Sequence, residues 1–204
     1  MNPITPLIPR QPVPPLEVPT VGGTVWRLAD ESPQLFTMIS FYRGQHCKVC
    51  SDYLALLDTK LSKFTERGVT AIAISADTQE RAEATKLAWK LQNLRIGYAL
   101  DMETARRWGL YITAGHFITR NGLAEPTLFS EPALYLVNPD GTLYFGSVQT
   151  MPFARPGWND VLYAIDFAVS KNYPSGGNVL DHKAALADVA AHGEQPREIL
   201  HRET

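Results

Sequence analysis

Apolar residues in this chain form short continuous runs that alternate with stretches of helical spacing. Residues 35–42 and 69–75 are rich in β-branched and aromatic side chains, a composition typical of strands buried on both faces. Between these runs, apolar residues recur every three or four positions and then meet a glycine stop signal at 66–68, which predicts a helix. A cap-like polar cluster opens a second predicted helix at residues 77–93.

The second half of the chain adds shorter elements and one stretch without clear signals. We expect a strand at 96–100, a helix at 103–108, an irregular insertion at 111–130, strands at 133–137 and 142–148, and a helix at 158–169. The tetrad Asn-Pro-Asp-Gly at 138–141 is typical of a tight turn, so the last two strands form an antiparallel hairpin. The pattern predicts an α/β fold with a mixed central sheet flanked by helices.

Both ends of the chain differ from this central pattern. Residues 1–19 form an extended proline-rich arm, ordered only where it lies on the body, and a glycine turn near residue 22 predicts a short hairpin over 20–30. A chain of 204 residues with 45% hydrophobic residues suits one core, which we place at 20–173. The tail, 174–204, is partly helical, with one amphipathic helix expected at 180–191.

Charge and hydropathy exclude several classes of partner. The formal net charge is −2, and the longest basic run is the dipeptide Arg106-Arg107, so we expect no nucleic-acid partner. No stretch of about eighteen apolar residues occurs, so we expect no membrane span. A basic amino-terminal region followed by a hydrophobic segment is also missing, which makes a cytoplasmic location the expectation.

The two cysteines, Cys47 and Cys50, lie just after the first buried run and at the start of the predicted helix. In a reducing compartment, this spacing is typical of a redox-active or metal-binding site rather than a structural cross-link. The alternatives are half of a zinc site and two small core residues. A lone CxxC supplies only two ligands, and the histidines His46 and His116 lack a ligand-like spacing, so we expect no metal.

A thiol at the amino end of a helix faces unpaired N–H groups and the positive end of the helix dipole, and both favour the thiolate. Cys47 has this position, so we predict that it is the nucleophile. Cys50, about one turn further on, is the predicted resolving thiol. Positive or potentially positive side chains at Arg43, His46 and Lys48 lower the thiol pKa further if they point inward.

Four segments together resemble the peroxiredoxin-like proteins of the alkyl hydroperoxide reductase/thiol-specific antioxidant (AhpC/TSA) group in the thioredoxin-like superfamily. They are 41–50 (FYRGQHCKVC), 68–80 (GVTAIAISADTQE), 101–110 (DMETARRWGL) and 131–146 (EPALYLVNPDGTLYFG). The resemblance spans about residues 15–170. It implies a thioredoxin-like fold, no cofactor, and an external dithiol reductant such as a thioredoxin-type protein or glutathione. The arm, the tail and the resemblance are also compatible with a homodimer.

The resemblance also implies substrate-binding residues around the dithiol. Pro132 matches the thioredoxin-type cis-proline that faces the dithiol and orients an incoming disulfide or thiol. Gly44 stands where peroxiredoxins usually place a threonine or serine that hydrogen-bonds the peroxide, and Ser40 replaces an upstream proline. The usual arginine before the late strand is replaced by Glu131.

We therefore name Arg43, Gly44, His46, Pro132 and Arg155 as candidate substrate-binding residues, with either Arg43 or Arg155 taking the place of the family's arginine. Three functions stay open at this stage. The first is reduction of hydroperoxides through Cys47 with Cys50 resolving. The second is thioredoxin-like thiol–disulfide exchange without significant peroxidase activity. The third is a non-catalytic, redox-responsive interaction protein.

Overall fold

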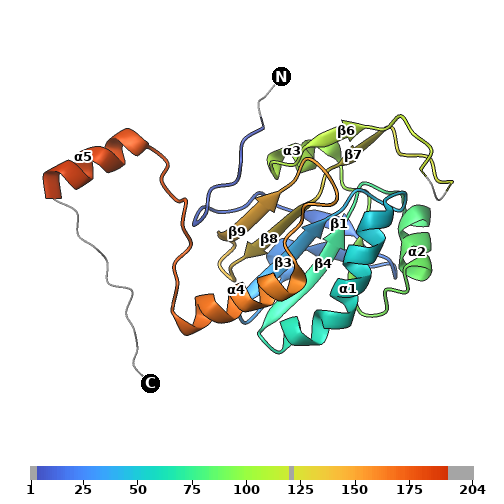
Figure 1. The fold of residues 1–204 in the computed structure, drawn as a ribbon, viewed down its shortest axis with the longest axis horizontal. Helices are drawn as coiled ribbons and strands as arrows, with labels where there is room; N and C mark the ends of the chain where they lie inside the picture. Colours follow the sequence, from blue (N-terminus) through green and yellow to red (C-terminus); the bar gives the residue numbers. More distant parts are fainter. Residues whose placement is uncertain (1–3, 120–121, 193–204) are drawn as a thin grey trace.

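A five-stranded mixed sheet forms the centre of the molecule (Figure 1). The computed structural model describes residues 4–119 and 122–192. The strand order is β5-β4-β3-β8-β9, with β3, β4 and β5 parallel and with β8 and β9 antiparallel to their neighbours. The strands are β3 (Phe36–Phe41), β4 (Val69–Ile74), β5 (Arg95–Gly97), β8 (Ala133–Val137) and β9 (Leu143–Val148). This arrangement confirms the predicted fold class.

Helices cover both faces of the sheet. On one face lie α1, α2 and α4, and on the other lies α3 together with the amino-terminal arm. The helices are α1 (Lys48–Thr65), α2 (Gln79–Ala88), α3 (Met102–Arg107), α4 (Trp158–Ser170) and α5 (His182–His192), preceded by the short 3-10 turn η1 (Leu28–Asp30). Two hydrophobic clusters result, one on each face.

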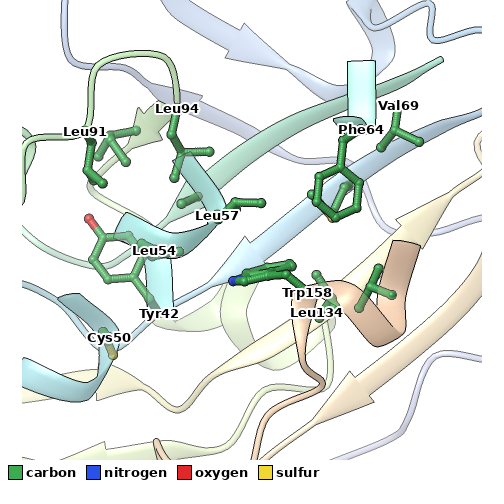
Figure 2. Close-up of a cluster of buried hydrophobic side chains, with 14 of the residues drawn as sticks. Tyr42, Cys50, Leu54, Leu57, Phe64, Val69, Leu91, Leu94, Leu134 and Trp158 are labelled. Carbon is green, nitrogen blue, oxygen red and sulfur yellow. The ribbon is translucent and has the colours of Figure 1, made fainter. Parts of the chain in front are cut away.

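Strand β3 separates the two clusters and is buried along its whole length. Met38 packs into the cluster under α1 and α4, while Ile39 and Phe41 pack into the opposite one. A strand with neighbours on both edges and helices on both faces has no solvated side, which explains why its sequence is almost continuously apolar. Figure 2 shows the larger cluster, in which Cys50 lies among large apolar side chains such as Leu54 and Trp158.

The amino-terminal arm lies on the body through backbone bonds and apolar contacts. The N–H of Arg10 donates to the carbonyl of Leu143 over 2.8 Å. A short hairpin forms around the expected glycine turn, from strands β1 (Glu17–Pro19) and β2 (Val25–Arg27), but its first strand lies in the arm, before the predicted range 20–30. Val18 and Trp26 of this hairpin are buried in the second cluster. Packing of the arm is thus continuous with the core, and the domain boundaries at 19 and 173 stay a prediction.

Two local expectations are wrong. Strand β5 ends at Gly97 rather than at 100, because the positive φ of Ala99 breaks the extended run. Helix α2 ends at Ala88 rather than at 93, because the carboxylate of Asp58 on α1 accepts three backbone N–H groups from residues 92–94 and holds them outside the helix. The polar cluster that was expected to open α2 does supply its cap, because the side chain of Thr78 accepts the N–H of Arg81.

The segment 111–130 is not the irregular insertion that the sequence predicts. Its described part contains strands β6 (Ile112–Ala114) and β7 (Leu128–Ser130), paired antiparallel as a two-stranded ribbon. The pairing brings together residues about sixteen positions apart, so no local pattern announces it. This ribbon, which we call the β6–β7 ribbon, brings several side chains to the dithiol.

The tail leaves the body after α4. Its first part is held where the hydroxyl of Ser175 donates to the carbonyl of Tyr144 over 2.6 Å. Helix α5 then projects away from the sheet (Figure 1), and its bounds agree with the helix expected at 180–191. The remainder of the predicted tail, from residue 193, lies outside the described residues. Within 4–119 and 122–192, no helix is long and apolar enough to cross a bilayer.

Candidate active site

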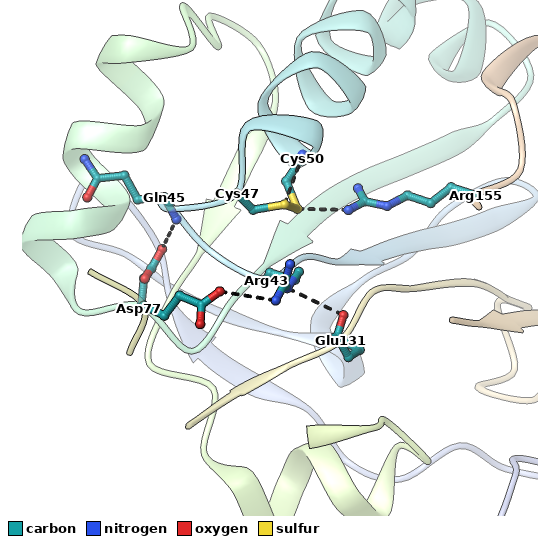
Figure 3. The surroundings of a disulfide bond; sticks show 8 residues. Arg43, Gln45, Cys47, Cys50, Asp77, Glu131 and Arg155 are labelled. Atoms are coloured by element: carbon teal, nitrogen blue, oxygen red, sulfur yellow. Dashed lines mark hydrogen bonds and ion pairs between the residues drawn. A yellow bond between two sulfur atoms is a disulfide. The ribbon is translucent and has the colours of Figure 1, made fainter. Parts of the chain in front are cut away.

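The dithiol lies where the central strand passes into the longest helix. Cys47 is the N-cap of α1, and its Sγ accepts the backbone N–H of Cys50 over 3.2 Å. The two residues form a disulfide, shown in Figure 3. Cys50 is fully buried and Cys47 is 4% exposed. The expected position of Cys47 at the helix start is confirmed, and it sets this sulfur among the unpaired N–H groups that favour a thiolate.

Lys48, one of the expected cations, does not contact the dithiol. Its ammonium pairs with the carboxylate of Asp52, one turn further along the exposed side of α1. Both side chains are largely exposed, so the pair is screened by solvent and contributes little. The electrostatic environment of the sulfurs is instead determined by side chains from other elements.

Gly44 lies in the loop between β3 and α1 at a φ of 131°, a backbone conformation that side chains disfavour. A Cβ at this position would lie 2.8 Å from both carboxylate oxygens of Asp77. The same carboxylate accepts the N–H of Gln45 over 2.7 Å and the Nε–H of Arg81 over 2.8 Å. Close approach to a buried acid therefore explains why this chain has no hydroxyl residue at position 44.

Arg43 holds the β6–β7 ribbon against the dithiol loop. Its guanidinium nitrogens lie 3.5 Å from the carboxylates of Glu125 and Glu131, and its Cζ lies 4.6 Å from the centre of the Phe129 ring. Phe129 lies in β7, Glu131 directly follows β7, and Glu125 lies in the segment between β6 and β7, so one cation connects the dithiol loop to all three. With its charge already shared between two acids, Arg43 is poorly suited to replace the family's arginine at the sulfur.

His46, which directly precedes the nucleophile, is a buried neutral side chain. Its ring packs on Phe129 at 4.8 Å between centroids, and neither ring nitrogen has a hydrogen-bond partner in the protein. Burial, helped by the nearby charge of Arg43, lowers the pKa of His46 to about 4. The imidazole is therefore uncharged at neutral pH and does not add the positive charge expected from the sequence.

This buried histidine predicts a specific loss of stability in acid. Between pH 6.5 and about 4, the unfolded chain binds a proton at His46 that the folded chain does not, so the free energy of unfolding falls as the pH falls through this window. The contribution is on the order of 3 kcal/mol. We expect His46→Phe, which suits the apolar contact with Phe129, to reduce the difference in stability between pH 7 and pH 4.5 in urea titrations.

His116 offers the matched control, because its side chain is exposed. His116→Gln should keep the pH dependence of the parent protein. Equal acid destabilisation of the parent and His46→Phe would contradict the burial of an uncharged imidazole at position 46.

Arg155 is the cation that reaches the dithiol. It comes from the loop between β9 and α4, and its Nη2 lies 2.9 Å from the Sγ of Cys50 (Figure 3). The guanidinium stacks over the ring of Tyr53, with 4.7 Å from Cζ to the ring centre. Of the two arginines named from the sequence, Arg155 alone contacts a sulfur, and that sulfur belongs to Cys50 rather than to Cys47.

The expectation of a cis bond before Pro132 is wrong, since the Glu131–Pro132 bond is trans. The chain stays extended from β7 into β8: the N–H of Glu131 donates to the carbonyl of Tyr111, and the carbonyl of Pro132 accepts the N–H of Gln149. Nothing in these bonds overcomes the modest trans preference of a prolyl bond. A contact between Pro132 and substrate stays a prediction, without the cis geometry that suggested it.

Sequence reasoning missed three residues that build the site. Asp77, which the sequence places only in the cap-like polar cluster before α2, is a buried acid that anchors the dithiol loop. Desolvation raises its pKa despite the Gln45 N–H and Arg81. Tyr53 and Phe129 carry the rings beneath Arg155 and Arg43. No local signal marks them, because each acts through a partner distant in sequence. In the described residues, no group of three His, Cys, Asp or Glu side chains could hold a metal ion.

A dithiol of this spacing, at the amino end of the helix that follows the central strand of a mixed sheet, defines a thioredoxin-fold thiol oxidoreductase. The model of the AhpC/TSA family matches residues 9–145, which is more than half of the chain. The chain therefore belongs to the AhpC/TSA family, and its redox-active dithiol is Cys47 and Cys50.

Solved peroxiredoxin structures share the fold. Peroxidoxin BcpB from Mycobacterium tuberculosis is 15% identical, with a TM-score of 0.62 over 80% of this chain and 98% of its own. A 2-Cys peroxiredoxin from Plasmodium vivax is 17% identical, with a TM-score of 0.65 over 82% and 86%. Prx3 from Vibrio vulnificus, solved with hydrogen peroxide, is 13% identical, with a TM-score of 0.61 over 78% and 99%. Comparison with curated protein sequences gives no significant match.

Proposed function

We propose that this protein reduces hydroperoxides by a cycle in which Cys47 is oxidised and Cys50 resolves it. The observation that carries the proposal is the position of Cys47 as the N-cap of α1, with the Cys50 N–H directed at its sulfur, in a chain of the AhpC/TSA family. The helix end stabilises the thiolate that the first step needs.

The chemistry is balanced over two steps. The Cys47 thiolate attacks one oxygen of the hydroperoxide, the O–O bond breaks, and the other oxygen leaves as an alcohol or water once it takes up a proton. Cys47 is then a sulfenic acid. The Cys50 thiolate attacks the Cys47 sulfur and displaces hydroxide, which leaves as water after protonation, and the disulfide forms.

Burial of the dithiol favours a small substrate over a protein disulfide. Cys50 is fully buried and Cys47 nearly so, which leaves little sulfur surface for a macromolecule in this conformation. The Vibrio vulnificus relative, solved with hydrogen peroxide, has the same fold. A thioredoxin-type or glutathione reductant, a homodimer and a cytoplasmic location stay predictions.

Thiol–disulfide exchange with small disulfides is the second candidate. Two features favour it: Gly44 offers no hydroxyl to a peroxide, and Glu131 stands in place of the arginine before the late strand. The carboxylate of Glu131 accepts a hydrogen bond from the hydroxyl of Thr113 over 2.6 Å and pairs with Arg43. Glu131 is therefore engaged by neighbouring side chains of the protein.

The two candidates differ in which oxidant the reduced protein consumes. We expect hydrogen peroxide in small excess to oxidise Cys47 at pH 7 at least about a hundredfold faster than it oxidises free cysteine, because a positioned thiolate is both more populated and better stabilised. Rapid quenching followed by intact mass measures this rate. A rate no faster than that of free cysteine, together with rapid reaction with oxidised glutathione, would establish disulfide exchange instead.

A further inference from the structure

Arg155 is fixed against the buried sulfur of the dithiol by contacts on several sides. Its Nη2 donates to the Sγ of Cys50 over 2.9 Å, and its guanidinium lies over the Tyr53 ring. The hydroxyl of Tyr53 donates to the carbonyl of Pro156, the next residue in the loop, over 2.9 Å, and the indole N–H of Trp158 donates to the backbone carbonyl of Tyr53. The loop before α4 and helix α1 thus both fix the position of the Arg155 guanidinium.

Among the described residues, this cation has no anionic partner in the oxidised protein. Within the described ranges 4–119 and 122–192, no carboxylate lies within 4.0 Å of Arg155, and its Nε and Nη1 are buried without a hydrogen-bond partner in the protein. Burial lowers the pKa of the guanidinium to about 10, which still leaves it charged at neutral pH. A disulfide sulfur is neutral and only a weak acceptor, so the site presents a full positive charge to an atom that has no matching charge.

A negative charge that matches Arg155 forms on the Cys50 sulfur when the disulfide is reduced. We propose that Arg155 is a catalytic residue of the reductive half of the cycle and stabilises Cys50 as the leaving thiolate when an external dithiol attacks Cys47. The inference rests on the roles proposed above for Cys47 and Cys50, and it assigns to the cation a step other than activation of the peroxide.

The step transfers two electrons. A thiolate of the external dithiol attacks the Cys47 sulfur, the bond between Cys47 and Cys50 breaks, and its electron pair goes to the Cys50 sulfur, which leaves as a thiolate beside Arg155. The second thiol of the reductant then loses its proton to solvent and attacks the mixed disulfide at the reductant's own sulfur. Cys47 is released as a thiolate, and the reductant becomes a disulfide.

The difference in exposure between the two cysteines favours attack at Cys47. Both side chains belong to the larger apolar cluster, but Cys47 is 4% exposed whereas Cys50 is fully buried. Exchange is faster when the leaving thiol has the lower pKa, so a cation on Cys50 favours attack at Cys47. An arrangement already in place before the charge develops needs no reorganisation during the step.

Other charged or titratable groups near Arg155 do not take over this role. Its interaction with Tyr53 and Glu131 favours the charged guanidinium, and that with Arg43 opposes it. Arg43 and Glu131 are already paired with each other, and burial raises the pKa of Tyr53, which stays a neutral phenol. Arg155 is therefore the cation available to the Cys50 thiolate.

The test uses the oxidised full-length protein and needs no peroxide. Dithiothreitol reduces the parent protein, Arg155→Met and Arg155→Lys at pH 7, with quenching by an alkylating reagent and intact mass as readout. We expect Arg155→Met to be reduced at least about tenfold more slowly, because a charge-assisted hydrogen bond to the leaving group is lost, and Arg155→Lys to recover part of the rate. Lys48→Met, which removes an exposed charge from the same helix end, should stay within about threefold of the parent.

A second measurement separates leaving-group stabilisation from a change in packing. In a Cys47→Ser background, thiolate absorbance reports the Cys50 pKa, which we expect to lie below the ordinary value of about 8.5 and to rise by at least about one unit with Arg155→Met. An unchanged pKa, or reduction of Arg155→Met at the parent rate, would overturn the proposal.

A third experiment identifies which of the two sulfurs the reductant attacks. A labelled monothiol should be trapped on Cys47, and trapping on Cys50 would also overturn the proposal. Failure of the peroxide reaction would leave these results unaffected, because they concern reduction of the disulfide alone.

Discussion

Cys50→Ser is expected to stop the proposed cycle after one hydroperoxide per chain. Cys47 still has its helix end, so the first oxidation proceeds at close to the parent rate. No second thiol in the chain can then reach the sulfenic acid, because the sequence contains only these two cysteines. Intact mass should show a gain of one oxygen atom, and steady-state consumption of peroxide with dithiothreitol should fall by at least about tenfold.

Cys47→Ser should lack even the first turnover, with peroxide loss no faster than in a buffer blank. It serves as the matched control, since it removes one sulfur from the same motif. A Cys50→Ser protein with parent turnover would contradict the roles assigned to the two sulfurs. Rapid single-turnover oxidation of Cys47→Ser would show instead that Cys50 is the nucleophile.

Gly44→Thr is expected to lower stability and peroxide reactivity, although it introduces the hydroxyl residue that peroxiredoxins usually carry there. The φ of 131° strains any side chain, at a cost of about 1–3 kcal/mol. In addition, the new Cβ overlaps the carboxylate of Asp77, which is fixed by Gln45 and Arg81. A total of roughly 3–5 kcal/mol corresponds to a fall in Tm of about 6–20 °C for a chain of this size, measurable by differential scanning calorimetry.

Gly22→Thr is the control that distinguishes backbone strain from steric overlap with Asp77 as the cause of the loss at position 44. Gly22 also has a positive φ, 109°, but a Cβ there meets no atom within 4 Å. Its Tm should therefore fall by less than half as much as that of Gly44→Thr. Equal losses would mean that backbone conformation alone excludes the hydroxyl, and a Gly44→Thr protein of parent stability with faster peroxide reduction would contradict the account of position 44.

Local patterns predict the parts of the fold that depend on local physics. Strand β3 is continuously apolar because it is covered on both faces, and α1 has its apolar positions on one side because it packs against one face. The helix start at Cys47 follows from the same pattern. These features place the dithiol without any long-range contact being known.

The rest depends on contacts between distant segments. Helix α2 ends early because the carboxylate of Asp58, on α1, accepts the backbone N–H groups that would otherwise continue the helix. The β6–β7 ribbon likewise depends on pairing between Ile112 and Ser130, which are distant in sequence. The choice between Arg43 and Arg155 was undecidable from sequence for the same reason, since each is positioned by partners far along the chain. The cis expectation for Pro132 came from resemblance alone, and the bond before this residue is trans.

Because Cys47 and Cys50 are only three positions apart, the disulfide restricts the unfolded chain very little. In the chain-entropy account, a loop this short contributes about 2 kcal/mol, against about 4.7 kcal/mol for a loop of 100 residues. Most of the margin against unfolding therefore comes from the sheet and its two clusters and is the same in both redox states. The protein can pass through repeated cycles of oxidation and reduction while its scaffold stays folded throughout.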